Sequence, residues 1–287
     1  MKNTHLKHLV ELNIAMMFVS TSGVLGKFIA MPPPLTIWWR SFLTIFCLGA
    51  YIWYKKINLK VHSKRDLTTI LISGFFMGAH WITYFYALKL SGVAIGMLAM
   101  FTYPIITVFL EPIFFKTKLD LKHVFLGGLV LVGIYFLTPE LTIENNVSLG
   151  VLSGIVSAVF YSIRNILMKK KTSNYHGSML MFYQMIVITI LLVPVFFIFE
   201  ANPSTNDWLG LAALALFTTA IGHTLFVLSM KHFSIGTISI ISSIQPIYGI
   251  LFGMLFLSEI PASKTIIGGF LILSTVVIES YYSHKNR

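Results

Sequence analysis

Two long stretches of the chain follow the same pattern. The segment from Gly92 to Leu137 is echoed by the segment from Ser234 to Glu279, and the shift from Pro104 to Pro246 is 142 positions. The same shift aligns further pairs: Ile105 with Ile247, Phe114 with Phe256, Gly127 with Gly269, Leu129 with Leu271 and Leu131 with Leu273. Each segment is an apolar run with an internal proline, a short polar turn and a second, glycine-led apolar run, which is enough for two membrane crossings. The repeat therefore predicts a chain built by doubling one unit.

The composition indicates that these apolar runs lie in a lipid membrane. Hydrophobic residues make up 56% of the 287 positions and charged residues only 11%, whereas soluble domains carry about a quarter charged residues. The runs have the length of membrane-spanning helices, about 20 residues, and lack the alternating pattern of a membrane β-barrel. Cys47 is the only cysteine, so the chain cannot form an internal disulfide or a thiolate metal cluster. We therefore predict an all-α integral membrane protein.

Ten transmembrane helices account for the whole chain. We place them at about residues 9–30, 34–54, 67–89, 93–115, 121–138, 148–168, 177–199, 208–230, 235–257 and 263–282. They divide into two five-helix repeats, residues 9–138 and 148–282. Because five is odd, the second repeat enters the membrane from the opposite side, as in transporters built from inverted repeats.

The basic residues predict the orientation. Sixteen of the 21 Lys and Arg residues fall in loops on the side of both termini, whereas the other side has only Lys27, Lys89 and Lys264. The positive-inside rule then places both termini in the cytoplasm of a multi-pass protein of the cell membrane. Because the basic residues lie in short loops between spans, we interpret them as topology signals and expect the lipid bilayer and a small molecule, and no nucleic acid, as partners.

The second repeat carries a family pattern. It contains Pro246, the turn Leu257-Ser258-Glu259-Ile260-Pro261 and the glycine pair Gly268-Gly269. This resembles the end of the EamA-type repeat of the drug/metabolite transporter superfamily, and Arg40 resembles the arginine of that repeat. The resemblance implies a carrier of small metabolites, often amino acids or related compounds. The first repeat departs from the pattern, because Thr117 stands where Glu259 stands in the second, and the role of Glu259 is left open.

Polar and aromatic residues in the middle of spans are candidates for a substrate site. His80, Trp81 and Tyr84 lie in the third span, and His223 lies at a similar depth in the eighth. Burying such groups in a membrane is costly, and they usually face a cavity or a partner. The alternative is that the two histidines only hydrogen-bond neighbouring backbone or hydroxyl groups.

Other candidates come from the fourth, ninth and second spans. Tyr103 and Gln245 immediately precede the paired prolines, where a backbone carbonyl is freed, and Tyr248 lies on the same polar face as Gln245. Arg40 could extend its side chain to the membrane surface (snorkel), or it could present the fork of parallel N–H groups of its guanidinium to a substrate carboxylate. We expect Arg164 to snorkel or to pair with Glu111. The first, third, fourth, sixth, eighth and ninth spans are expected to line the cavity.

These features favour a secondary transporter, an exporter of small metabolites such as amino acids, working by alternating access. Its candidates for proton coupling are His80, His223 and Glu111. One alternative is a drug or lipophilic-cation exporter, favoured by the aromatic residues and Glu111, and another is a non-transporting membrane enzyme or assembly subunit. The chain contains no Walker loop, metal-ligand spacing or nucleophile elbow, so we expect neither enzyme activity nor a cofactor or metal. Substrate, direction, coupling ion and oligomeric state are left open by the sequence.

Overall fold

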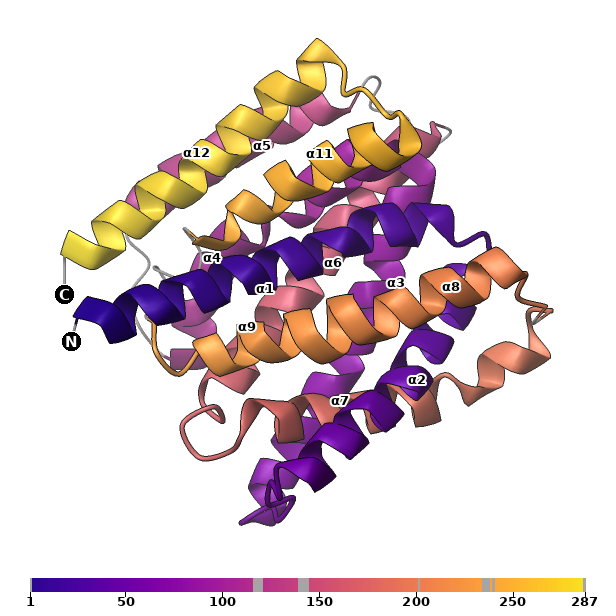
Figure 1. The fold of residues 1–287 in the computed structure, drawn as a ribbon. Coiled ribbons are helices and arrows are strands. Elements are labelled where there is room, and N and C mark those ends of the chain that lie inside the picture. The colour runs from indigo at the N-terminus through magenta and orange to yellow at the C-terminus, as the bar shows by residue number, and fades with distance from the viewer. Residues whose placement is uncertain are drawn as a thin grey trace.

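A computed structural model describes residues 2–115, 121–138, 145–200, 202–233, 238 and 241–285 of the chain. Within these residues the regular structure is entirely helical. The long helices pack side by side into one bundle, and both termini lie at the same end of it (Figure 1). We call that end the terminal face and the opposite end the far face. Thr117 lies outside the described residues.

The first repeat contains five crossings. Its helices are α1 (Lys2–Phe28), α2 (Pro33–Tyr54), α3 (Lys64–Met100), α4 (Tyr103–Phe115) and α5 (Leu121–Leu137). A run of prolines separates α1 from α2, and Pro33 occupies the first turn of α2, where its missing N–H costs nothing. The third span and the first part of the fourth are both assigned to α3, which is broken at Gly92.

Gly92 makes the turn between the third and fourth crossings. Its φ of +83° lies in the left-handed region that glycine tolerates best. The next residue, Val93, donates its backbone N–H to Glu259 Oε2 at 2.8 Å. A Cβ atom at position 92 would lie 3.1 Å from the same oxygen. Glu259 of the second repeat thus holds a turn of the first, which gives this glutamate a structural role that the sequence left open.

The second repeat also contains five crossings. Its helices are α6 (Asn146–Lys169), α7 (Gly177–Leu191), α8 (Thr205–Ala213), α9 (Thr224–Ser229), α11 (Ile244–Leu257) and α12 (Ser263–Lys285). A 3₁₀ segment, η1 (Val193–Phe197), follows α7, and a π-helical segment, η2 (Leu214–His223), joins α8 to α9 into one span. The sequence did not predict the π-helical segment, which contains His223.

The lengths of the helices confirm an all-α membrane protein of ten crossings. Six helical stretches are long and apolar enough to cross a membrane by length and composition alone. Shorter apolar helices at Tyr103–Phe114, Val124–Leu137, Ile244–Leu257 and Ser263–Ile278 complete the remaining crossings.

The packing of the helices follows the repeat. Helices α1 and α6 are equivalent in the two repeats, and each packs on the other repeat. Helix α6 contacts α3, and in the same way α1 contacts η2 and α9. Helix α6 also contacts α4, and α1 contacts the equivalent helix α11. The helix pairs α2 with α7 and α5 with α12 each join equivalent helices of the two repeats. In Figure 1 the pair of α5 and α12 lies along one edge of the bundle. This exchange of equivalent contacts is what inverted repeats around a two-fold axis produce.

Two hydrogen bonds reproduce the repeat at atomic detail. Ser20 Oγ donates to the Gln245 carbonyl at 2.9 Å, and Ser162 Oγ donates to the Tyr103 carbonyl at 2.9 Å. Both pairs of positions differ by the same 142 residues that separate the repeats. The residues before the paired prolines are therefore anchored by equivalent serines from α1 and α6.

Small residues bring α3 and α6 into close contact. An added Cβ atom at Gly154 would lie 2.6 Å from Ala99 Cβ, and one at Gly150 would lie 2.5 Å from Ser91 Cβ. Both distances are shorter than a van der Waals contact, so the two helix backbones could not keep their separation. Glycine is required here because α6 crosses both parts of α3.

We predict that Gly154→Ala destabilises the protein by about 1 to 3 kcal/mol, because the added methyl overpacks the contact of α3 with α6. The matched control is Gly128→Ala in α5, where an added Cβ meets no atom within 4 Å. That change should leave the stability equal or slightly higher, since alanine favours helix. Thermal unfolding of purified protein in detergent measures both, and equal effects of the two substitutions would contradict this packing.

Candidate functional site

Aromatic rings from both repeats meet in the centre of the bundle. Tyr161 of α6 stacks on His80 with ring centroids 4.4 Å apart, and it meets Tyr103 edge-on at 4.9 Å. His80 in turn stacks on Tyr84, one helical turn further along α3, at 6.0 Å. Trp81 meets the ring of His223 at 5.3 Å. These six side chains are at most 5% exposed, so they form a buried aromatic chain between the repeats.

Arg40 lies against this chain. Its guanidinium carbon is 3.6 Å from the centroid of the Trp81 ring, a cation–π contact, and its Nε donates to Thr219 Oγ1 at 2.7 Å. The side chain is 0% exposed, so Arg40 does not snorkel, and its two terminal nitrogens have no hydrogen-bond partner in the described protein. The second span thus contributes to the centre, in addition to the six spans that we expected to line it.

The two central histidines differ in their hydrogen bonds. His80 Nδ1 lies 2.7 Å from Ser157 Oγ, and Ser157 Oγ also donates to the His80 carbonyl at 2.9 Å. These bonds hold His80 between α3 and α6. His223 is equally buried, but its Nδ1 has no hydrogen-bond partner in the described protein.

The structure corrects the expectation for Arg164. This side chain is 0% exposed and does not snorkel. Its Nη2 and Nε donate to Gln184 Oε1 at 2.9 and 3.3 Å, and its Nη1 donates to Asn165 Oδ1 at 3.0 Å. The amide oxygens on α6 and α7 stabilise the charge inside the bundle, because they replace the water that snorkelling would supply.

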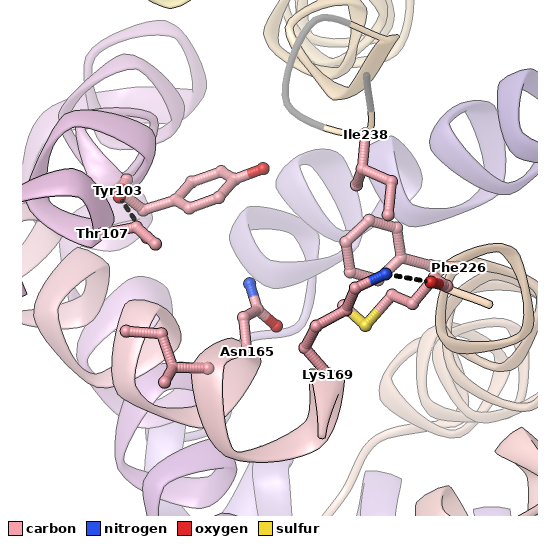
Figure 2. A pocket seen from close by; sticks show the side chains of 8 residues that line it. Tyr103, Thr107, Asn165, Lys169, Phe226 and Ile238 are labelled. Atoms are coloured by element: carbon pink, nitrogen blue, oxygen red, sulfur yellow. Dashed lines mark hydrogen bonds between the residues drawn. The ribbon is translucent and has the colours of Figure 1, made fainter. Parts of the chain in front are cut away.

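A small pocket reaches the aromatic chain from the terminal face. Its volume is about 40 Å³, room for a few water molecules and less than a metabolite needs. It is lined by Tyr103, Thr107, Asn165, Ile166, Lys169, Phe226, Met230 and Ile238. In Figure 2 the Tyr103 ring and the Asn165 amide point toward its middle. Lys169 Nζ donates to the Met230 carbonyl at 2.5 Å. Tyr103 belongs to both the pocket and the aromatic chain, so the pocket ends where the chain begins.

Polar contacts link helix ends at the far face, two of them within the first repeat and two between the repeats. Lys27 Nζ lies 3.7 Å from Glu259 Oε1 and 3.4 Å from the Lys89 carbonyl. Lys89 Nζ donates to the Ala30 carbonyl at 3.1 Å, and the Ala30 N–H donates to Asp207 Oδ1 at 2.8 Å. These bonds join the ends of α1 and of the third span to the starts of α8 and of the tenth span.

The remaining candidates lie outside the aromatic chain. Gln245 is buried at the start of α11, and Tyr248 donates to Asn13 Oδ1 at 2.8 Å, where α11 packs on α1. Glu111 is half-buried in α4. The structure therefore brings together Arg40, His80, Trp81, Tyr84, Tyr103 and His223, and it places the other three on helices next to them.

Sequence reasoning missed Ser157 and Tyr161 on α6, although it discussed Arg164 on the same helix. Ser157, Tyr161 and Arg164 follow at intervals of four and three residues, which places them on one face of the helix. That spacing was a usable signal. Thr219 gave none, because it is one of many hydroxyl residues in the spans.

Comparisons with known proteins agree with this architecture. A model of the EamA-like transporter family matches residues 10–138 and 148–281. A solved crystal structure is similar over 98% of this chain and 99% of its own, with a TM-score of 0.70 at 17% identity, which shows the fold.

Three relatives show the same likeness in sequence. An uncharacterized transporter of Archaeoglobus fulgidus is 26% identical over 75% of this chain and 76% of its own. The uncharacterized transporter YxxF of Bacillus subtilis is 24% identical over 86% and 81%. The pseudopaline exporter CntI of Pseudomonas aeruginosa is 22% identical over 85% and 84%. The chain is a multi-pass membrane transporter and belongs to the EamA-like transporter family.

Proposed function

We propose that the protein is a secondary transporter that exports small metabolites, such as amino acids or related compounds, by alternating access. One observation carries this proposal: polar contacts join the repeats at the far face, and a pocket approaches the buried centre from the terminal face. The repeats are proposed to span residues 9–138 and 148–282. The relative named as an exporter supports export as the direction.

The proposed substrate site consists of Arg40, His80, Trp81, Tyr84, Tyr103, His223, Gln245 and Tyr248. An inverted repeat explains how such a site can open alternately, because an exchange of the two repeat conformations converts one opening into the other. A drug or lipophilic-cation exporter is disfavoured, because the buried charges among the described central residues are the arginines Arg40 and Arg164.

Substrate flux tests the proposal. The purified protein in liposomes should move at least one member of a panel of amino acids, organic cations and phosphate esters faster than protein-free liposomes do. The absence of flux for every member would argue for a membrane enzyme or an assembly subunit instead.

The proposed topology places both termini in the cytoplasm. In a Cys47→Ala background, a cysteine at Asn145 should react with an impermeant thiol reagent in intact cells, and cysteines at Asn3 and Ser283 should not. Permeabilised cells provide the control, because all three positions should then react. Reaction at 3 and 283 and protection at 145 in intact cells would reverse the orientation.

We predict that a proton gradient drives the flux and that His223 carries the coupling. Its Nδ1 has no partner in the described protein, whereas His80 Nδ1 is held by Ser157. In liposomes with and without a pH gradient, His223→Gln should therefore lose the response to the gradient, and His80→Gln should keep it.

A pair of histidines at the terminal face supplies the control. His8 stacks on His232 with centroids 3.9 Å apart, and partial burial lowers the pKa of His232. His8→Gln should leave the gradient response unchanged, because this pair lies outside the proposed site. If the pH gradient does not change the flux of the wild type, the protein works by exchange or downhill transport. If His223→Gln and His80→Gln both keep the response to the gradient, Glu111 becomes the candidate for proton coupling.

A further inference from the structure

Arg40 holds a buried positive charge with most of its hydrogen-bonding capacity unused. The guanidinium stays charged at any physiological pH and offers five N–H donors. Only Nε has a partner, Thr219 Oγ1 at 2.7 Å, while Nη1 and Nη2 are fully buried and have none in the described protein. Burial of a charge without a partner is strongly unfavourable, so a cation of this kind marks a functional site.

Arg164 shows how this protein stabilises a buried arginine that needs no ligand. It is as buried as Arg40, yet all three of its nitrogens donate to the side-chain oxygens of Gln184 and Asn165. Arg40 has no such amides. Its main compensation is the face of Trp81 at 3.6 Å, and a ring quadrupole offsets only part of the cost of desolvating a charge.

The described protein supplies no counter-ion for Arg40. Asp207 is the only fully buried carboxylate among the described side chains. It belongs to the far face, where it accepts hydrogen bonds from the Ala30 N–H and from Ser204. None of the described buried carboxylates therefore supplies a negative charge for the guanidinium.

His223 adds a second polar group, its Nδ1 atom, that has no hydrogen-bond partner in the described protein. Thr219, which binds Arg40 Nε, lies four residues before His223, so both side chains lie on one face of the same helical segment. The imidazole and the guanidinium both contact the Trp81 ring. Arg40 and His223, which both carry atoms without a partner in the described protein, are thus brought together by Trp81.

We infer that the Nη atoms of Arg40, with His223 Nδ1 beside them, bind the carboxylate of the transported metabolite. This inference rests on the proposed transport function and names its substrate class. A planar carboxylate matches the two parallel N–H groups of a guanidinium fork. One carboxylate also neutralises one guanidinium, whereas the dianion of a phosphate monoester would leave a surplus negative charge in the bundle. The rings of Trp81 and Phe85, 3.6 and 5.8 Å from the guanidinium carbon, provide apolar surface for the organic part of the substrate.

The first test needs no substrate. Arg40→Met removes an unpaired charge and keeps much of the apolar volume, so the melting temperature of the empty protein in detergent should rise by about 2 to 5 °C. The matched control Arg164→Met leaves Gln184 and Asn165 without their donor and should lower the melting temperature. A fall for Arg40→Met comparable to that for Arg164→Met would make Arg40 a structural residue and overturn the inference.

The second test uses flux into liposomes. The compounds are the 20 amino acids, their carboxamides, phenyl phosphate and tetraphenylphosphonium. The transported compounds should be free carboxylates, with the matching carboxamides and Arg40→Gln each slower by about tenfold or more. Equal flux of carboxylates and carboxamides, or flux confined to the phosphate or the cation, would overturn the inference and leave the transporter intact. No flux for any compound would overturn the proposed function and the inference with it.

A permanently bound inorganic anion is the remaining explanation for the unpaired fork. Replacing chloride by isethionate, a large anion without a carboxylate, should leave the melting temperature of the wild type unchanged if a transported carboxylate is the natural counter-ion. A fall in the wild type that is absent in Arg40→Met would show that chloride occupies the fork, and it would overturn the inference.

Discussion

The fold depends on the requirement that polar groups inside a membrane find their partners within the protein, because the hydrocarbon offers none. The requirement is met at the interface of the two repeats. Ser20 and Ser162 bind equivalent carbonyls there, and Ser157 holds His80. Arg164 satisfies the requirement with amide oxygens. Within the described residues, both Nη atoms of Arg40 and Nδ1 of His223 are among the buried polar atoms that find no partner, and Arg40 alone combines this with a full charge.

A symmetric framework carries an asymmetric site. The serine anchors and the exchanged helix contacts follow the repeat, as the proposed exchange of conformations between the halves requires. The charged and aromatic residues do not follow it: the position equivalent to Arg40 is Phe182, and the position equivalent to His80 is Gly222. Symmetry in the framework suits alternating access, while asymmetry in the side chains suits recognition of one particular substrate. The Glu259 contact at the far face is equally asymmetric, because its equivalent in the sequence is Thr117.

Helices, repeats and family were predictable from the sequence, because membrane spans leave long apolar runs and a doubled chain leaves aligned prolines and glycines. The stacking of His80 on Tyr84 also followed from their spacing. The burial of Arg164 did not follow, because it depends on Gln184 of another helix. The turn at Gly92 agrees with the gap predicted between spans 67–89 and 93–115, but its contact with Glu259 and the π-helical segment that contains His223 escaped prediction. The Glu259 contact could not be predicted because it joins two spans of different repeats.

The central claim is that the far face must open for transport, and a reversible cross-link across it tests this most directly. Lys27 and Glu259 would be replaced by cysteines in a Cys47→Ala chain and joined with a cleavable bifunctional thiol reagent. The account predicts that substrate flux in liposomes stops when the link forms and returns when it is cleaved, while the two single-cysteine chains treated with the same reagent keep their flux. Undiminished flux through the fully cross-linked protein would contradict alternating access through this face.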